Sequence, residues 1–142
     1  MINVGIIGSG FIGPAHIEAL RRLGFVQVVA LCDGSLVKAQ EKAHQLNVPH
    51  ACASVEELLA LPNLHAVHNC TPNHLHAEIN CQILRAGKHV FSEKPLGVTM
   101  EQCLQAEAAV ARHPELVCML GFMRRYDKSY AYAKEKITAG AI

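Results

Sequence analysis

The sequence predicts an α/β fold with a doubly wound parallel sheet. Apolar runs typical of buried strands alternate with helical patterns along the whole chain. A glycine-rich turn, Gly8-Ser9-Gly10-Phe11-Ile12-Gly13, joins the first run to the first helical pattern. Asp33 ends the second run about 20 residues later, which is the layout of a dinucleotide-binding Rossmann fold. We therefore expect residues 1–142 to form one Rossmann domain.

Six apolar runs are expected to be the strands of this sheet. Several are nearly continuous and rich in Val and Ile, as is typical of parallel strands covered on both faces. The expected strands are Ile2–Ile7, Val26–Cys32, His50–Cys52, Ala66–Thr71, His89–Ser92 and Leu116–Gly121.

Six helical patterns separate and follow these runs. Pro14 fits a first helical turn, where its missing N–H costs nothing. Ser54 and Thr99 are expected N-caps, and Gln102 completes a capping box with Thr99. Gly87 is a C-terminal stop signal. The expected helices are Gly13–Leu23, Ser35–Leu46, Val55–Ala60, Asn73–Ala86, Met100–Arg112 and Lys128–Ala139.

The glycine-rich turn has the spacing needed to bind a pyrophosphate. Gly8 allows a tight turn, and Gly10 lets the backbone approach the ligand without a Cβ in the way. Gly13 lets the helix pack closely on the strand. The pyrophosphate would lie at the helix N-terminus, where free N–H groups favour negative charge. An ordinary strand-to-helix turn is the alternative, and Asp33 at the next strand end makes it the weaker one.

Asp33 predicts NAD rather than NADP as the cofactor. A carboxylate there accepts hydrogen bonds from the adenosine ribose and repels a 2′-phosphate, and NADP usually brings an arginine nearby. The segment Gly34–Val37 contains no arginine. Lys38 is the nearest cation, and in a helix that starts at Ser35 it could point away. The alternative is that Asp33 only starts a turn with the following glycine.

Composition excludes several classes of function. The chain of 142 residues has a net charge of +1 with mixed signs, so it lacks the basic patch of a nucleic-acid-binding protein. No apolar run approaches the roughly 18 residues that span a bilayer. The first strand begins by the second residue, which leaves no room for a signal peptide and favours a cytoplasmic protein.

Cysteine and histidine are frequent without a pattern that indicates a special site. None of the six cysteines forms a CxxC pair, and several lie in apolar runs, where cysteine behaves as a small hydrophobe. A disulfide framework is therefore not expected. The nine histidines include no HExxH or Cys/His cluster, so no metal site is expected either.

Three further segments follow strands and contain polar groups at the sheet edge where such folds place ligands. Cys70–His76 is either a binding loop or an N-capped helix start. Ser92–Pro95 holds Glu93 and Lys94, which form either a surface turn or a site for proton transfer or polarisation. Gly121–Asp127 carries two arginines, which either bind a polyol or phosphate or form a solvated helix entry.

The order of these motifs closely resembles the glucose–fructose oxidoreductase and inositol dehydrogenase family (Gfo/Idh/MocA) over essentially the whole chain. Gly121–Asp127 is most similar to inositol 2-dehydrogenases. The resemblance implies hydride transfer between NAD or NADP and a secondary alcohol of a sugar or a cyclitol such as myo-inositol. It also implies a second, larger α/β domain after residue 142, which carries the aspartate–histidine pair whose histidine is the general base.

The resemblance gives roles to individual positions. Lys94 would be the catalytic residue that hydrogen-bonds the reacting hydroxyl, and its peptide bond to Pro95 a candidate for the cis form. Met123 and Arg124 would line the substrate, although many relatives have Asn at the former position, which leaves the sugar class open. The cofactor-binding positions would be Gly8, Gly10, Phe11, Ile12, Gly13, Asp33, Thr71, Pro72, Asn73, His76, Glu93 and Lys94.

Three functions remain to be distinguished. The leading one is the NAD-binding domain of a sugar or cyclitol dehydrogenase, inactive by itself and part of a homo-oligomer in its full-length form. The second is a free-standing, non-catalytic NAD-binding module. The third is a structural partner without nucleotide binding, which the intact glycine turn and Asp33 argue against.

Overall fold

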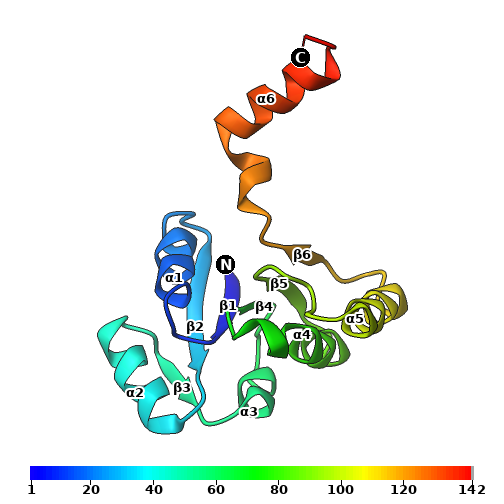
Figure 1. The fold of residues 1–142 in the computed structure, drawn as a ribbon. Coiled ribbons are helices and arrows are strands. Elements are labelled where there is room, and N and C mark those ends of the chain that lie inside the picture. The colour runs from blue at the N-terminus through cyan, green and yellow to red at the C-terminus, as the bar shows by residue number, and fades with distance from the viewer. Residues whose placement is uncertain (142) are drawn as a thin grey trace.

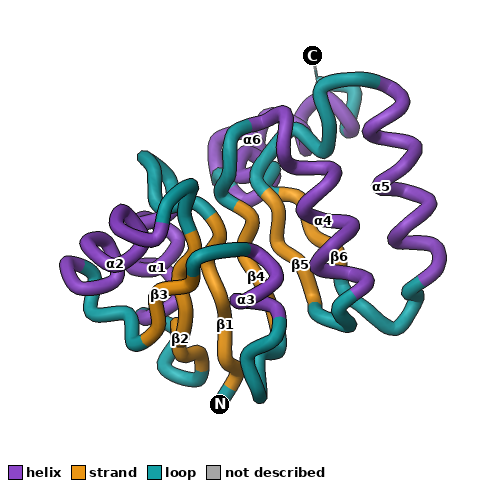
Figure 2. The backbone as a smooth tube through the Cα atoms, turned by 90° about the horizontal axis from the view of Figure 1, so that it is seen from below, coloured by secondary structure: helices purple, strands orange, loops and turns teal. Residues whose placement is uncertain are grey.

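The computed structural model describes residues 1–141 and contains one six-stranded parallel sheet (Figure 1). The strand order is β3-β2-β1-β4-β5-β6, and Figure 2 shows the strands in this order as a row. The order reverses between β1 and β4, so the carboxyl ends of these two strands form the crevice at which doubly wound sheets bind ligands. The strands are β1 (Ile2–Ile7), β2 (Val26–Cys32), β3 (His50–Cys52), β4 (Ala66–Asn69), β5 (His89–Ser92) and β6 (Cys118–Leu120).

Helices cover both faces of the sheet, as the alternation of elements predicts. The α-helices are α1 (Gly13–Arg21), α2 (Leu36–Gln45), α3 (Val55–Leu59), α4 (His76–Arg85), α5 (Met100–Arg112) and α6 (Lys128–Thr138). Two 3₁₀ turns, η1 (Asn73–Leu75) and η2 (Met123–Tyr126), precede α4 and α6.

Two apolar cores fill the space between sheet and helices, one on each face. On the first face, α1 and α2 bury Ile17 and Ala39 against the sheet. On the second face, α3, α4 and α5 bury Leu58, Ile83 and Ala109. Because both faces are covered, the strands need apolar residues on each side, which explains their nearly continuous apolar runs.

A bulge in β2 changes the direction of the strand before it ends next to Asp33. Val4 of β1 pairs with Val28, whereas the next residue, Gly5, pairs with Ala30. Val29 is therefore the extra residue, and both it and Ala30 lie on the side of α3, α4 and α5. The bulge thus resets which face the remaining residues of β2 point to.

Polar side chains end β4 earlier than the sequence predicts. The expected strand Ala66–Thr71 stops at Asn69, whose Oδ1 accepts hydrogen bonds from the backbone N and from Oγ1 of Thr71 at 3.3 and 2.6 Å. The helix expected over Asn73–Ala86 is divided into η1 and α4, and Asn73 gives no side-chain cap. The strand end and the loop after it therefore form one turn around Asn69.

Side-chain caps start four of the helices. Ser35, Ser54 and Thr99 accept hydrogen bonds from the backbone N–H three residues later. Gln102 reaches back as predicted, but its Oε1 accepts from the backbone N of Val98 and not from that of Thr99. Asp127 caps α6 in the same manner, through Ser129 and Tyr130.

The segment after β6 extends away from the sheet. In Figure 1, α6 projects beyond the body of the domain. Every residue of α6 except Lys136 is exposed, so this helix contributes nothing to either core.

Candidate functional site

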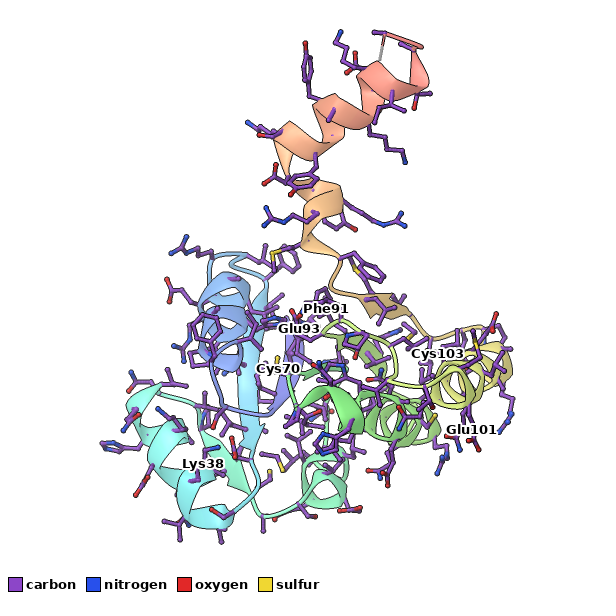
Figure 3. The ribbon with its side chains drawn as sticks, viewed as in Figure 1. Lys38, Cys70, Phe91, Glu93, Glu101 and Cys103 are labelled. Atoms are coloured by element: carbon purple, nitrogen blue, oxygen red, sulfur yellow. The ribbon has the colours of Figure 1, made fainter. Side chains whose placement is uncertain are left out.

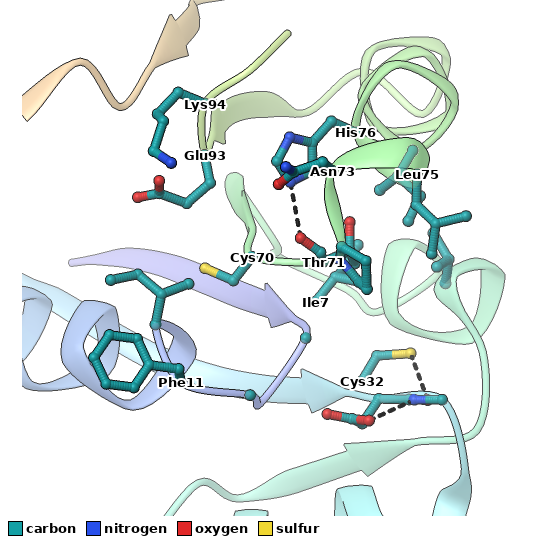
Figure 4. Close-up of a pocket in the computed structure, with 18 of the residues that line it drawn as sticks. Ile7, Phe11, Cys32, Cys70, Thr71, Asn73, Leu75, His76, Glu93 and Lys94 are labelled. Atoms are coloured by element: carbon teal, nitrogen blue, oxygen red, sulfur yellow. Dashed lines mark hydrogen bonds between the residues drawn. The ribbon is translucent and has the colours of Figure 1, made fainter. Parts of the chain in front are cut away.

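A cavity of about 750 Å³ lies at the carboxyl ends of β1, β2, β4 and β5. Figure 4 shows this cavity with residues from the glycine turn, the end of β2 and the loops after β4 and β5 around it. Of the positions predicted from the sequence, Gly13 and Arg124 are not part of its wall. The predicted residues that line it are Gly8, Gly10, Phe11, Ile12, Asp33, Thr71, Pro72, Asn73, His76, Glu93, Lys94 and Met123.

Each of the three glycines of the turn is required for a different physical reason. Gly8 has φ +94°, and a Cβ there would lie 2.5 Å from the carbonyl oxygen of Cys70. A Cβ on Gly13 would overlap the carbonyl oxygen of Gly8. No heavy atom lies within 4 Å of a Cβ built on Gly10. Packing within the chain therefore requires the first and third glycines, whereas the second leaves space open at the cavity.

The start of α1 borders the same cavity. Ile12 precedes the helix and gives no side-chain cap, and Pro14 stands in the first turn. The backbone N–H groups of this first turn are therefore available to a ligand. Such a helix start favours an anion, because its N–H groups and the helix dipole both attract negative charge.

At the β2 end of the cavity, the Asp33 carboxylate is held by several donors of the chain. The backbone N and the hydroxyl of Ser9 both donate to Oδ2, the former at 2.7 Å. The backbone N of Gly34 donates to Oδ1 at 2.7 Å. Although burial alone raises the pKa of Asp33, the hydrogen bonds from Lys38, Ser9 and Gly34 lower it to about 2.

Lys38 does not point away from this carboxylate. Its Nζ lies 2.7 Å from Oδ1 of Asp33, so the prediction that the nearest cation could turn outward from the site is wrong. The reason is the position of Lys38 one turn into α2, where the helix starts directly beyond the end of β2. The β2 end of the cavity thus contains both a carboxylate and an ammonium group.

At the β5 end, Glu93 and Lys94 follow the strand directly. Glu93 Oε1 accepts a hydrogen bond from His16 Nε2 at 3.0 Å. Figure 4 shows the side chains of Glu93 and Lys94 at the same end of the cavity. The Lys94–Pro95 peptide bond is cis, as the resemblance implied. Lys94 is exposed, in contrast to Glu93, whose side chain is 13% exposed.

A second cavity of about 390 Å³ adjoins this end. Lys94 and Met123 line both cavities, and Arg124 lines only the second. The other residues of its wall are Gly121, Phe122 and Arg125. The predicted substrate residues Met123 and Arg124 are therefore brought together beside Lys94.

His76 connects the two loops that form the far wall of the first cavity. It is 1% exposed, with Nδ1 2.6 Å from the carbonyl oxygen of Pro95 and Nε2 2.8 Å from that of Thr71. Asn69, which is fully buried, donates to Asn80 Oδ1 at 2.8 Å behind this wall. These contacts fix the loop after β4 relative to the loop after β5.

Sequence reasoning missed several residues of the site. Ser9 stands inside the glycine turn, where its hydroxyl was a usable signal. Lys38 was noted and assigned the wrong direction. No local sequence pattern indicated His16 and His68. His16 contacts Glu93, which is 77 residues away in the sequence, and His68, which is 52 residues away.

Residues 1–141 contain neither a metal cluster nor a membrane-spanning helix. No group of three or more His, Cys, Asp or Glu side chains there has the arrangement of a metal site. No helix in this part of the chain is long and apolar enough to cross a membrane.

Comparisons with known proteins relate this chain to a family of oxidoreductases. The model of an oxidoreductase family with an NAD-binding Rossmann fold matches residues 2–122. Inositol 2-dehydrogenase of Pseudomonas savastanoi pv. phaseolicola is 38% identical over 99% of the chain and 43% of its own length. The 4-carboxy-2-hydroxymuconate-6-semialdehyde dehydrogenase of Sphingobium sp. is 33% identical over 99% of the chain and 44% of its own length. The chain thus spans less than half the length of these relatives.

Solved structures show the same relationship. The scyllo-inositol dehydrogenase of Lactobacillus casei, with bound NAD(H) and scyllo-inositol, superposes with a TM-score of 0.90 at 31% identity. That match covers 100% of this chain and 42% of the other. A levoglucosan dehydrogenase in complex with NADH and levoglucosan has a TM-score of 0.90 at 33% identity, over 99% of this chain and 40% of the other.

Proposed function

Because the chain belongs to the Gfo/Idh/MocA oxidoreductase family and is its NAD-binding Rossmann domain, we propose that it serves a dehydrogenase of sugars or cyclitols. The dehydrogenase transfers a hydride from a secondary alcohol, such as one of myo-inositol, to NAD. Relatives named inositol 2-dehydrogenase and solved complexes with scyllo-inositol and levoglucosan support this substrate class.

The arrangement of the two cavities around Lys94 is the observation that carries the proposal. With the adenosine ribose on Asp33 and the pyrophosphate at the start of α1, the nicotinamide lies over β4 and β5. The second cavity opens at that end, and Lys94 stands between the two. A substrate in the second cavity would therefore meet the nicotinamide beside the Lys94 ammonium.

Lys94 would then act on the reacting hydroxyl. A cation beside the hydroxyl stabilises the negative charge that develops on oxygen as the proton leaves, and it lowers the pKa of that hydroxyl. Glu93, held by His16, lies at the nicotinamide end of the cofactor cavity. Met123 and Arg124 would form the wall against which the substrate is positioned.

The general base is expected outside this chain. The chain spans 43% of an inositol 2-dehydrogenase, and we propose that the remaining part of such a protein supplies the base and the other wall of the substrate pocket. A positioned base contributes typically about 10²–10⁴-fold to the rate. The 142-residue chain is therefore expected to bind NAD and to form almost no NADH from inositol or glucose.

Substitution of Lys94 in the protein encoded by the full gene tests the proposal. Lys94→Ala should lower kcat by on the order of 10²-fold or more with nearly unchanged NAD affinity. Arg125→Ala, in the second cavity but not the first, is the comparison, because it should act mainly on KM. Near-normal turnover of Lys94→Ala would contradict the proposal. NAD binding without any turnover by the native protein would favour a non-catalytic module.

A further inference from the structure

A cluster of two histidines, one phenylalanine and one glutamate lies at the β5 end of the cofactor cavity, on the face covered by α1. His16 of α1 contacts Glu93 Oε1 through Nε2 at 3.0 Å and His68 Nδ1 through Nδ1 at 2.9 Å. The rings of His68 and Phe91 stack with centroids 4.7 Å apart, and Figure 3 shows Phe91 beside Glu93. The His16 and Glu93 side chains are 12% and 13% exposed.

The glutamate has little freedom to leave this cluster. A Cβ on Gly121 would lie 3.1 Å from Glu93 Oε1, so the missing side chain at that position leaves the space that the carboxylate occupies. On the other side, Cys70 faces the carboxylate as a neutral thiol, because burial and then the charge of Glu93 raise its pKa to about 12. Lys94, the next residue, supplies the other charge at this end of the cavity.

The cluster can hold His16 in either charge state. A carboxylate only accepts hydrogen bonds, so His16 Nε2 carries a proton and donates to Glu93. If His16 is neutral, its Nδ1 accepts from His68; if it is cationic, its Nδ1 donates and His68 accepts. His68 itself stays neutral, since burial and then His16 lower its pKa to about 3.

The charge of this cluster bears on the redox state of the cofactor. The nicotinamide ring of NAD⁺ carries a positive charge, and that of NADH carries none. A carboxylate at the nicotinamide end therefore attracts NAD⁺ more strongly than NADH. A positive charge on His16, which lies 3.0 Å from Glu93, would cancel much of this attraction. The effect of the Lys94 ammonium on the bound cofactor is the same whether His16 is neutral or cationic.

We propose that His16 determines the preference of this domain for oxidised over reduced cofactor by setting the net charge of the His16–Glu93 pair. Neutral His16 leaves the pair with the negative charge of Glu93 and favours NAD⁺, whereas cationic His16 makes the pair neutral and weakens that preference. Protonation of His16 adds that positive charge, so the preference for NAD⁺ should fall as the pH is lowered. The inference rests on the proposed function in that the nicotinamide lies at the β5 end.

Titration of the native chain with NAD⁺ and NADH, from about pH 8 down to about 5.5, tests this without any substitution. The ratio Kd(NADH)/Kd(NAD⁺) should decrease on the order of three- to tenfold. ADP-ribose, which lacks the nicotinamide, reports how the shared part of the ligand responds to pH. It should show none of the difference between the two cofactors.

Two variants assign the effect to residues. His16→Gln keeps a donor for Glu93 without a titrating charge, so the ratio should stay high across the pH range. Glu93→Gln removes the carboxylate, so the ratio should stay low. His113→Gln is the matched control, because His113 also contacts a carboxylate, that of Glu115 at 3.5 Å, away from both cavities, and should retain the native profile.

A pH-independent ratio in the native chain would overturn the inference, as would a native pH profile in His16→Gln. Binding of both cofactors with such a flat ratio leaves the proposed function intact. Failure to bind either cofactor at any pH would overturn both. Circular dichroism at each pH and for each variant establishes that the titrated protein is folded.

Discussion

The two ends of the cofactor cavity are built in different ways. At the β2 end, Asp33 is only 7% exposed in its side chain and is held by Ser9, Gly34 and Lys38. At the β5 end, Lys94 is exposed, and among the described residues none pairs with its ammonium. The second cavity opens beside it.

This difference suggests that the β2 end serves to bind the cofactor and that the β5 end serves the reaction. Asp33, which we propose to hold the adenosine ribose, already has its partners within the chain, so it is positioned before a ligand arrives. Lys94 at the β5 end is exposed beside the second cavity, where we propose that the substrate and further groups of the whole protein lie. Substitutions at the β2 end should therefore change cofactor affinity in this chain by itself, whereas those at the β5 end need the whole protein to show their full effect.

The largest effect that this chain alone should show comes from the middle of the cavity, at Gly10. A Cβ there meets no protein atom within 4 Å, so Gly10→Ala should fold normally and weaken NAD binding tenfold or more by occupying the space of the pyrophosphate. Gly13→Ala is the matched variant. Its Cβ would overlap the Gly8 carbonyl oxygen, and overpacking typically costs about 1–3 kcal/mol of stability.

Calorimetric titration and thermal unfolding measured on both variants distinguish the two effects. Loss of stability in Gly10→Ala, or unchanged stability in Gly13→Ala, would contradict the distinction drawn between these glycines.

The choice between NAD and NADP tests the β2 end. The native chain should prefer NAD, because the Asp33 carboxylate repels a 2′-phosphate. Asp33→Ser should reduce the ratio of NAD affinity to NADP affinity by on the order of tenfold or more, because it removes the repulsion of the 2′-phosphate. It also releases the Lys38 ammonium, which in the native chain lies 2.7 Å from the Asp33 carboxylate, to pair with that phosphate. Titration with both cofactors measures the change.

The double variant Asp33→Ser with Lys38→Gln separates the two causes. If Lys38 contributes, NADP affinity should fall again in the double variant while NAD affinity stays near that of the single one. Equal NADP affinity in both variants would mean that only the loss of repulsion matters.

The sequence was sufficient for the fold because each element has a local pattern. Buried parallel strands require continuous apolar runs, and caps such as Ser54 and Thr99 mark helix starts. The end of β4 was misjudged because Asn69 turns the chain through its side chain rather than through a glycine or proline.

The site was only partly predictable for a related reason. The glycine turn and Asp33 form a motif within one stretch of sequence. The direction of Lys38 depends on the rotation of α2 about its axis at the end of β2, which composition does not specify. The pairing of His16 with Glu93 depends on how α1 packs on β1 and β2, which brings the His16 side chain to the ends of β4 and β5, and no spacing in the sequence encodes that distance.

Acid should weaken the domain through Asp33. Its pKa is about 2 in the folded chain and about 3.9 in an unfolded one, so the carboxylate is stabilised by folding. The contribution is fully present above the unfolded pKa and is lost as the pH falls from about 4 to about 2, and it amounts to at most about 2.6 kcal/mol. Asp33→Asn should therefore lower the free energy of unfolding at pH 7 and make little difference near pH 2.

Urea unfolding at several pH values measures this. Glu41→Gln, an exposed carboxylate on α2, is the control and should leave the pH dependence unchanged. A constant difference between native chain and Asp33→Asn at all pH values would mean that the hydrogen bonds to Asp33 do not depend on its charge.

The smallest expected effect concerns the exposed segment beyond the β5 end. Tyr126, Tyr130 and Tyr132 are 71%, 53% and 60% exposed, and Phe122 and Met123 at the second cavity are 46% and 56% exposed. Apolar surface that lies open in this way favours contact with other molecules, so the 142-residue chain should self-associate as its concentration rises.

Tyr130→Ser should lower the association constant a few-fold, since burial of one partly exposed aromatic contributes on the order of 1 kcal/mol. Phe25→Ser is the matched control, because Phe25 is 57% exposed but lies at the amino end of β2, whereas the exposed segment follows the carboxyl end of β6. Light scattering over a concentration series measures both. A clean monomer at high concentration would show that the exposed segment causes no association, and an equal effect of both variants would mean that the contact is nonspecific.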